Sequence, residues 1–205
     1  MGKIFDALTE LRLVRAVSAG RKPAPWVGAP IVWLDLETTG LDPQRDSILE
    51  VAVEVVDAPI PRMILHRSQH VLQFGDPRAI GRNIHERVLE MHTQNGLWAE
   101  CARSSLTAAN VEVLVMDELR PFVQPGQLLT LAGSSVHFDL GFLRSRMPNL
   151  ARMFSHRLLD VSAIKIFCEG LGMPSAARGE PAHRAAADII ESQRALAAMQ
   201  QWCVR

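Results

Sequence analysis

Tyrosine is absent from all 205 residues of the chain, and only three cysteines are present. Without tyrosine, no reaction that needs a phenol as base, nucleophile or stacking surface can operate here. The cysteines are Cys101, Cys168 and Cys203, and they form no CxxC pair. We therefore expect three reduced thiols rather than a zinc site or a disulfide framework.

The chain also lacks a long apolar segment and a net charge. No stretch approaches the ~20 apolar residues of a membrane helix, so we expect no membrane partner. Lysine plus arginine equals aspartate plus glutamate, at 22 each. This balance argues against a broad electrostatic grip on duplex nucleic acid. The 48% hydrophobic content is enough for one domain with its own core.

Residues 1–30 differ in charge from the rest of the chain. They hold five basic and two acidic side chains, so residues 31–205 carry a net charge of −3. The run 21–30 (RKPAPWVGAP) is typical of a linker. No apolar segment of a secretory signal follows the basic start, and Asp6 and Glu10 are atypical of a mitochondrial leader. We expect an N-terminal extension, 1–30, and one domain, 31–205, in the cytoplasm, or in mitochondria if the extension directs targeting.

The domain has strand patterns first, and then strands that alternate with helices. The runs 31–36 (IVWLDL), 48–56 (ILEVAVEVV) and 63–74 are separated by turn residues, which predicts an antiparallel meander. Further strands are predicted at 128–131 and 158–161, and helices at 80–92, 104–120, 138–147, 162–169 and 185–201. This order predicts an α/β fold with a mixed sheet: three antiparallel strands, then parallel strands, flanked by helices.

Two acidic residues interrupt the first apolar strand. Asp35 and Glu37 are two residues apart, and side chains alternate along a strand, so both carboxylates point to the same face. Burying two unpaired acids costs free energy, which a bound divalent cation would remove. The alternative is that the strand ends at Leu36 and both acids lie in a solvated loop.

Two further acids lie near predicted helix starts. Asp139 follows a predicted strand within 132–143 (AGSSVHFDLGFL), and as an isolated residue it would be a helix cap. Asp188 lies early in the last helix, where an acid interacts favourably with the helix N-terminus. His183 lies five residues before Asp188. Positions five apart do not share a helix face, so we expect His183 to lie just before the helix and to lean in.

This set of residues resembles the three motifs of the DEDDh 3′–5′ exonucleases, in the RNase H-like superfamily. The order and spacing fit from 31 to 200. DEDDy relatives place a tyrosine where His183 lies, so the absence of tyrosine excludes that branch. A narrower resemblance is to oligoribonuclease, through HTQNGL at 92–97, GSSVHFDLGFL at 133–143, MPNL at 147–150 and RLLDVS at 157–162. Proofreading subunits of DNA polymerases lack the last two blocks.

The resemblance implies an RNase H-like fold and hydrolysis of very short RNA from the 3′ end, down to dinucleotides, with release of 5′-mononucleotides. It also implies two Mg²⁺ or Mn²⁺ ions, since two divalent metal ions commonly assist phosphodiester hydrolysis. Asp35, Glu37, Asp139 and Asp188 would be the ligands, and His183 would be the general base.

The same resemblance assigns the contacts with the substrate. Leu41 matches a leucine that inserts between two bases, and His92 matches a histidine beside the bases. Ser135, Arg157 and Ser162 match residues that cap the 5′-phosphate, for which the planar guanidinium of arginine is suited. Such a cap would restrict the enzyme to short strands.

The chain departs from the family at three positions. His156 replaces a tyrosine, Ala163 replaces a threonine, and Arg87 replaces a tryptophan five residues before His92 if no gap intervenes. Arginine can stack on a base, and Trp98 is the nearby alternative. The family is homodimeric, with the segment around His156 near the partner chain, so the resemblance also implies a homodimer.

Two other functions compete with this one. A DEDDh exonuclease could act on single-stranded DNA or on longer RNA ends, as proofreading and trimming nucleases do. The neutral charge and the phosphate-cap residues favour short RNA instead. A non-catalytic RNase H-like scaffold would lack one of the five motif residues, and none is missing.

Overall fold

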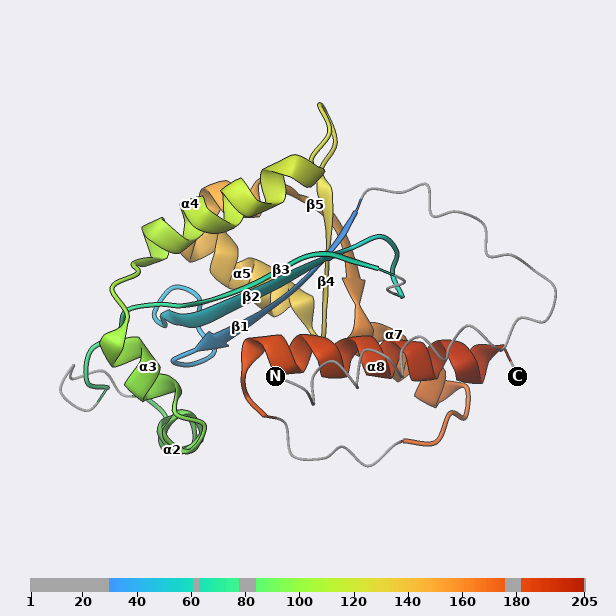
Figure 1. The fold of residues 1–205 in the computed structure, drawn as a ribbon. Helices are drawn as coiled ribbons and strands as arrows, with labels where there is room; N and C mark the ends of the chain where they lie inside the picture. Colours follow the sequence, from blue (N-terminus) through green and yellow to red (C-terminus); the bar gives the residue numbers. More distant parts are fainter. Residues whose placement is uncertain (1–29, 61–62, 78–83, 176–181, 205) are drawn as a thin grey trace.

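A five-stranded sheet lies at the centre of the computed structural model, which describes residues 30–60, 63–77, 84–175 and 182–204 (Figure 1). The strands are β1 (Ile31–Thr38), β2 (Ile48–Val56), β3 (Ile64–Val71), β4 (Leu129–Gly133) and β5 (Phe154–Asp160). Their order is β3-β2-β1-β4-β5. The first three are antiparallel, whereas β4 and β5 add in parallel to β1. This confirms the predicted mixed sheet.

Helices flank the sheet on both faces. They are α2 (Glu86–Gln94), α3 (Leu97–Arg103), α4 (Ala108–Leu119), the 3₁₀ turn η2 (Arg120–Phe122), α5 (Val136–Arg146), α6 (Pro148–Ala151), α7 (Val161–Gly170) and α8 (Ala185–Cys203). Over the described ranges, no helix is long and apolar enough to cross a membrane. Apart from Pro30, the predicted extension lies outside the described residues, as does the start of the helix predicted at 80–92.

Several helices differ from the prediction, and the short helix α6 was not predicted. α3 was not predicted, and the segment 104–107 assigned to the next helix is a loop, because α4 begins only after the capping residue Thr107. α5 begins at Val136, two residues before the predicted start. Asp139 therefore lies inside the first turn of the helix and is not its cap.

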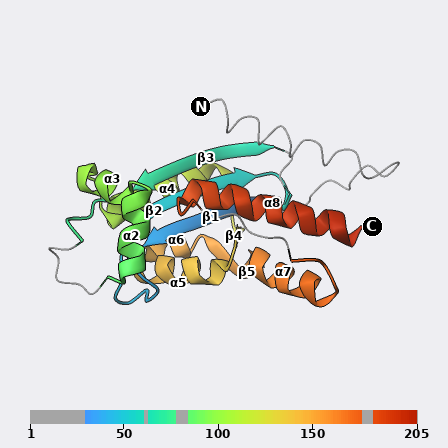
Figure 2. The ribbon, with the colours of Figure 1, turned by 90° about the horizontal axis from the view of Figure 1, so that it is seen from below.

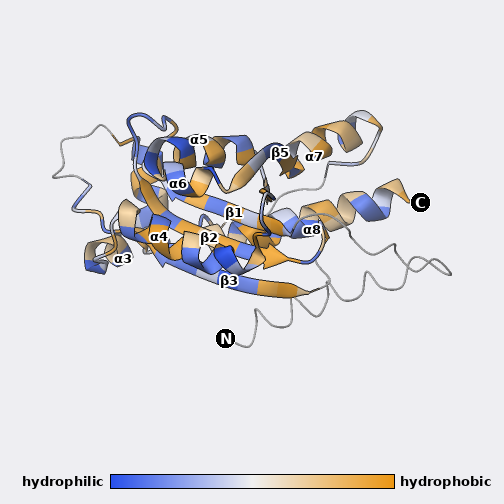
Figure 3. Ribbon diagram, turned by 90° about the horizontal axis from the view of Figure 1, so that it is seen from above, coloured by the Kyte–Doolittle hydropathy of each residue, from blue (hydrophilic) through white to orange (hydrophobic). Residues whose placement is uncertain are grey.

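The alternating side chains of β1 divide the core into two layers. Val32, Leu34 and Leu36 belong to the cluster formed with α4 and α5, whereas Ile31 and Trp33 belong to the cluster formed with α7 and α8. α8 runs across one face of the sheet, and α4 and α5 lie on the other (Figures 1 and 2). The central strands are predominantly orange in the hydropathy colouring of Figure 3. Residues at odd positions of β1 therefore face α8.

A glycine lets β4 approach β1 closely at the end of their pairing. A Cβ added at Gly133 would lie 2.8 Å from the carbonyl oxygen of Leu34 and 3.3 Å from the side chain of Val136. Leu34 is in the central strand and cannot move aside without disturbing β2. The packing therefore requires glycine here.

We expect Gly133→Ala to lower the free energy of unfolding by about 1–3 kcal/mol, because the added methyl overpacks a buried strand contact. Urea denaturation would measure this. Gly170→Ala at the end of α7 is the control, since its Cβ would meet no atom within 4 Å, and it should leave stability unchanged or slightly higher. Equal stability of the two variants would contradict the close approach.

Candidate active site

Two carboxylates extend from the end of β1 toward α8. The strand continues through Thr38, so the alternative in which it ends at Leu36 is wrong. Asp35 lies opposite Ala52 of β2, and Glu37 lies opposite Glu50. The side chains at these odd positions share the face that α8 covers, and Glu37 is buried. β1 therefore presents two acids in a largely enclosed place.

α8 brings a third carboxylate to this pair. Asp188 lies in the first turn of α8, and one oxygen from each of Asp35, Glu37 and Asp188 lies within 4.8 Å of the others. Residues separated by about 150 positions in sequence thus meet at one point. The spacing expected of a metal site is present in these three.

Asp139 reaches the same strand from the other side of the sheet. It is buried in the first turn of α5, and its Oδ1 accepts a hydrogen bond of 3.1 Å from the backbone N–H of Leu36. Leu36 lies between Asp35 and Glu37, and the charge of Asp139 helps to raise the pKa of Asp35. Asp139 is therefore next to the three-carboxylate group, although it is not one of its members.

Burial and mutual repulsion hold these acids in their protonated form more strongly than usual. Burial raises the pKa of Glu37 to about 8, with further contributions from Asp188 and Glu50. Burial also raises the pKa of Asp139 to about 7, although hydrogen bonds from the backbone oppose the shift. The pKa values of Asp35 and Asp188 are likewise raised, mainly by burial. The positive charge near these carboxylates is too small to offset their burial and their mutual repulsion.

The donor set fits a divalent cation. Three carboxylate oxygens at close range are hard ligands, which Mg²⁺, Mn²⁺ and Ca²⁺ prefer. A cation would also offset the burial and the repulsion that raise the pKa of these acids, and its binding would release their protons. Asp35, Glu37 and Asp188 could hold such an ion directly, and Asp139 lies close enough to support it.

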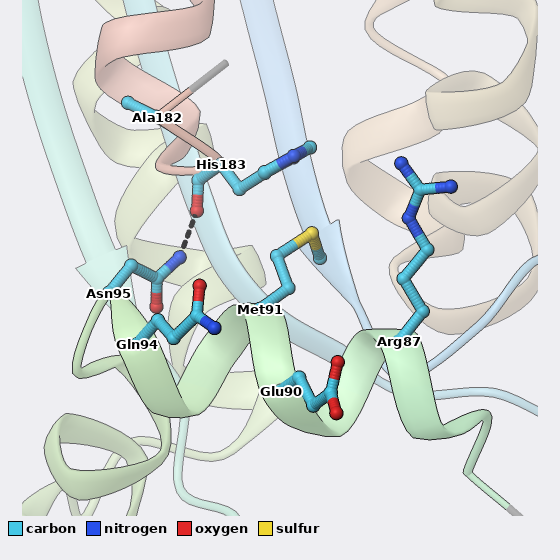
Figure 4. Close-up of a pocket in the computed structure, with 7 residues that line it drawn as sticks. All are labelled: Arg87, Glu90, Met91, Gln94, Asn95, Ala182 and His183. Carbon is cyan, nitrogen blue, oxygen red and sulfur yellow. Dashed lines mark hydrogen bonds between the residues drawn. The ribbon is translucent and has the colours of Figure 1, made fainter. Parts of the chain in front are cut away.

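His183 lies immediately before the helix that carries Asp188, as the spacing of five predicts. α8 begins at Ala185, and the backbone of His183 adopts a left-handed conformation with a φ of 49°. His183 is close enough to Asp188 to oppose the increase in the pKa of that acid. Its carbonyl oxygen accepts a hydrogen bond from Asn95, and its imidazole points away from Asn95 (Figure 4).

His92 and Trp98 lie in the interior. The side chain of His92 is fully buried, and its Nε2 lies 3.4 Å from the carbonyl oxygen of Thr38 and 3.8 Å from a carboxylate oxygen of Glu37. Trp98 packs edge-on against His92 and also contacts Phe74. The idea that Trp98 replaces the missing base-stacking tryptophan is therefore not supported, because its ring is buried in the core.

The predicted phosphate-cap serines do come together. The hydroxyl groups of Ser135 and Ser162 are 3.1 Å apart. Asp160 Oδ1 joins them by accepting the backbone N–H of Ser135 at 3.0 Å and that of Ser162 at 2.9 Å. Ser135 is left-handed, with a φ of 55°. Arg157 lies exposed on β5, and no hydrogen bond between it and these serines is present among the described residues.

Two other predicted substrate contacts are open to solvent. Leu41 is 81% exposed in the turn after β1. Arg87 lines a pocket of about 390 Å³ between α2 and the segment before α8 (Figure 4). Glu90, Met91, Gln94 and Asn95 also line this pocket, and His183 borders it from the other side. A ligand beside His183 would meet Arg87.

Three residues of the site escaped prediction from the sequence. Glu50 is 0% exposed beside Glu37, and Arg184 forms an ion pair with it at 2.7 Å. Asn95 holds the carbonyl group of His183. One signal was available for Glu50, since it follows an apolar pair in a strand as Asp35 does. Nothing in the local sequence distinguishes Arg184 or Asn95.

The comparisons with known proteins agree with this geometry. The family model described as "Exonuclease" matches residues 32–196. The oligoribonuclease of Mycobacterium sp. (strain KMS) is 38% identical over 170 residues, which cover 81% of this chain and 77% of the relative. That of Mycobacterium bovis (strain BCG / Pasteur 1173P2) is 36% identical with the same coverage. The chain belongs to the oligoribonuclease family.

Solved structures of other exonucleases share the fold. The RNase domain of yeast Pop2 matches with a TM-score of 0.59 at 12% identity, covering 98% of this chain and 84% of that one. The zinc-bound form of the E. coli ExoI–ssDNA complex matches with a TM-score of 0.63 at 14% identity, covering 87% of this chain and 42% of that one. The predicted RNase H-like exonuclease fold is thereby confirmed for this family member.

We expect the metal-free protein to lose stability as the pH rises from about 5 to 8. The raised pKa values mean that the folded state binds more protons than the unfolded chain in this range, so the free energy of unfolding falls with pH. Glu37→Gln removes one such group and should stabilise the metal-free protein at pH 8 by about 1–3 kcal/mol, with little effect near pH 5.

Urea denaturation in EDTA at several pH values measures this difference. Asp117→Asn is the control, because Asp117 is exposed on α4, on the other face of the sheet, and pairs there with Arg120 three residues later. An advantage of Glu37→Gln that is the same at pH 5 and pH 8 would contradict the raised pKa. Adding a divalent cation should reverse the ranking, since only the wild-type site has all its ligands.

Proposed function

We propose that this chain is a 3′–5′ exoribonuclease that hydrolyses very short RNA oligonucleotides, down to dinucleotides, to 5′-mononucleotides. The observation that carries the proposal is the meeting of Asp35, Glu37 and Asp188 within 4.8 Å, in a chain 36–38% identical to oligoribonucleases. The same identity disfavours the alternative, an exonuclease for single-stranded DNA or for longer RNA ends. The ligand we propose is therefore a short single-stranded oligonucleotide.

Two Mg²⁺ or Mn²⁺ ions are the proposed cofactors. When bound, such ions activate the attacking water and neutralise the charge that develops on the phosphate and the leaving oxygen. The residues that hold them are Asp35, Glu37 and Asp188, with Asp139 in support. Zinc is less suited, because the site offers carboxylates and no sulfur ligand among the described residues.

His183 is the proposed general base. A ring nitrogen of His183 that carries no proton can take the proton from the attacking water. Its position at the border of the pocket supports this role. Arg87 lines the same pocket, and we propose that it contacts a base there in place of tryptophan.

The predicted substrate contacts favour short strands. Ser135 and Ser162, held together by Asp160, offer hydroxyl groups to a terminal 5′-phosphate, with Arg157 as the cationic partner. Leu41 is exposed enough to insert between two bases. His92, in contrast, is buried behind Glu37, and we propose that its main part is to orient that carboxylate.

The apolar outer face of α7 supports a homodimer. Ile166, Phe167 and Leu171 are 71%, 65% and 60% exposed, and α7 is largely orange in Figure 3. α7 follows β5, the end strand of the described sheet, on which His156 is exposed. We propose that a second copy covers this face.

We likewise propose a cytoplasmic location, with mitochondria as the alternative if residues 1–30 direct targeting.

A length series tests the preference for short substrates. On 5′-phosphorylated RNA of two to ten nucleotides with Mg²⁺ or Mn²⁺, we expect kcat/KM to fall by about tenfold or more from the shortest to the longest strand, because the phosphate cap fits only short ones. Matched DNA strands should be poorer substrates.

Two variants test the residues behind this preference. Ser162→Ala should reduce the difference in kcat/KM between short and long strands, and Asp35→Ala should be inactive. Equal turnover at all lengths would contradict the cap, and activity of Asp35→Ala would contradict the ion site.

Sedimentation velocity tests the dimer. We expect the wild-type chain to sediment as a dimer and Phe167→Glu to sediment as a monomer, because a buried charge at an apolar interface is costly. Val113→Glu is the control, since Val113 is exposed on α4 at the other side of the domain. A monomeric wild type, or a dimeric Phe167→Glu, would contradict the α7 interface.

A further inference from the structure

The backbone around His183 is held in an unusual conformation. A φ of 49° lies in the left-handed region, which costs free energy for any residue other than glycine and persists only when the surroundings enforce it. The side-chain amide of Asn95 donates to the carbonyl oxygen of His183 (Figure 4). This hydrogen bond restrains the carbonyl group of His183. The next residue, Arg184, restrains the backbone that follows it.

Arg184 binds two carboxylates from different elements. Its Nε and one terminal nitrogen donate to Glu50 of β2, over 2.7–3.3 Å. Its two terminal nitrogens also donate to Glu100 of α3, at 2.9 and 2.8 Å. A guanidinium that is engaged on two edges has little freedom to rotate. The backbone of Arg184, and with it that of His183, is tied to β2 and α3.

The same glutamate also sets the start of α8. Glu50 accepts the backbone N–H of Ala185, the first residue of the helix, at 2.8 Å. The N-cap residue of α8 is Arg184, which provides no side-chain cap of its own. Glu50 therefore takes the capping role from a neighbouring strand. Because Glu50 lies opposite Glu37 in the sheet, the start of α8 is aligned with the acids of β1.

We propose that Arg184 is a positioning residue that acts through His183. By joining Glu50 and Glu100, Arg184 keeps the residue before it in the left-handed conformation that orients the imidazole at the border of the pocket. This inference rests on the proposed role of His183 as general base. In this proposal, Arg184 acts on the reaction only through His183.

A purely structural role is the rival explanation, and the chain contains a matched control for it. Arg67 of β3 pairs with Glu54, which is four residues beyond Glu50 on β2 and equally buried. Gln193 of α8 also donates to Glu54. The two arginine–glutamate pairs thus share a strand and a helix, but only Arg184 adjoins His183. Loss of either pair should lower the melting temperature, and only loss of Arg184 should lower catalysis.

The test is a double-mutant cycle on a dinucleotide at saturating Mn²⁺, with thermal unfolding of each variant. We expect Arg184→Gln to lower kcat by about tenfold or more, with a smaller change in KM, because a displaced base loses much of its contribution. His183→Asn removes the base while tolerating the left-handed backbone. In that background, Arg184→Gln should lower kcat by less than about twofold. Arg67→Gln should keep its kcat.

Three results would overturn the proposal: an unchanged kcat of Arg184→Gln, additive effects in the cycle, or recovery of kcat at higher Mn²⁺ concentrations, which would indicate a defect in ion binding. Activity of His183→Asn equal to wild type would instead refute the proposed base, so the two failures are distinguishable. If Arg184→Gln does not fold, Glu100→Gln removes one acceptor and leaves Glu50 paired. It should lower kcat by a smaller factor, with the same dependence on His183.

Discussion

The repulsion among buried carboxylates on one face of the sheet is the constraint on which the rest of the structure depends. Besides burial, the charges of Glu37, Glu50 and Asp188 raise the pKa of Asp35, and those of Asp188 and Glu50 raise the pKa of Glu37. Glu50 is neutralised by Arg184, whereas the other three have raised pKa values. A protein gains nothing in stability from such an arrangement. It is explained by a cation that the three carboxylates would share.

β1 and β4 separate at the end of the sheet where these acidic side chains lie. β1 pairs with β4 only from Ile31 to Trp33, while its pairing with β2 continues to Thr38. Beyond Trp33 the backbone of β1 is no longer covered by β4, so the N–H of Leu36 can bind the side chain of Asp139. The divergence of the two parallel strands therefore lets a helix from the opposite layer contribute an acid, as ligand sites at the carboxyl ends of parallel strands commonly require.

The sequence predicted what depends on local periodicity and missed what depends on pairing. The alternation in β1 and β2 located both strands, and the spacing of Asp35, Glu37, Asp188 and His183 indicated the site. α3 was missed because it has only seven residues and begins after a left-handed Gly96 without a side-chain cap. The ion pair of Glu50 and Arg184 joins residues 134 positions apart, and only the register of β1 against β2 brings it beside Glu37.

The sequence motif 92–97 (HTQNGL) indicated that this segment belongs to the site, but it did not indicate that His92 is buried. The resemblance assigned His92 to the substrate, but its ring is buried beside Glu37, and burial lowers its pKa. With its proton on Nε2, it can donate to the carbonyl oxygen of Thr38 beside Glu37.

Asn95 of the segment 92–97 donates a hydrogen bond to the carbonyl group of His183. Leu97 of the same segment is buried in the core. One short stretch thus supports both sides of the site: the acid from β1 and the histidine before α8. The position of this segment therefore depends on the alignment of two distant elements, β1 and the start of α8.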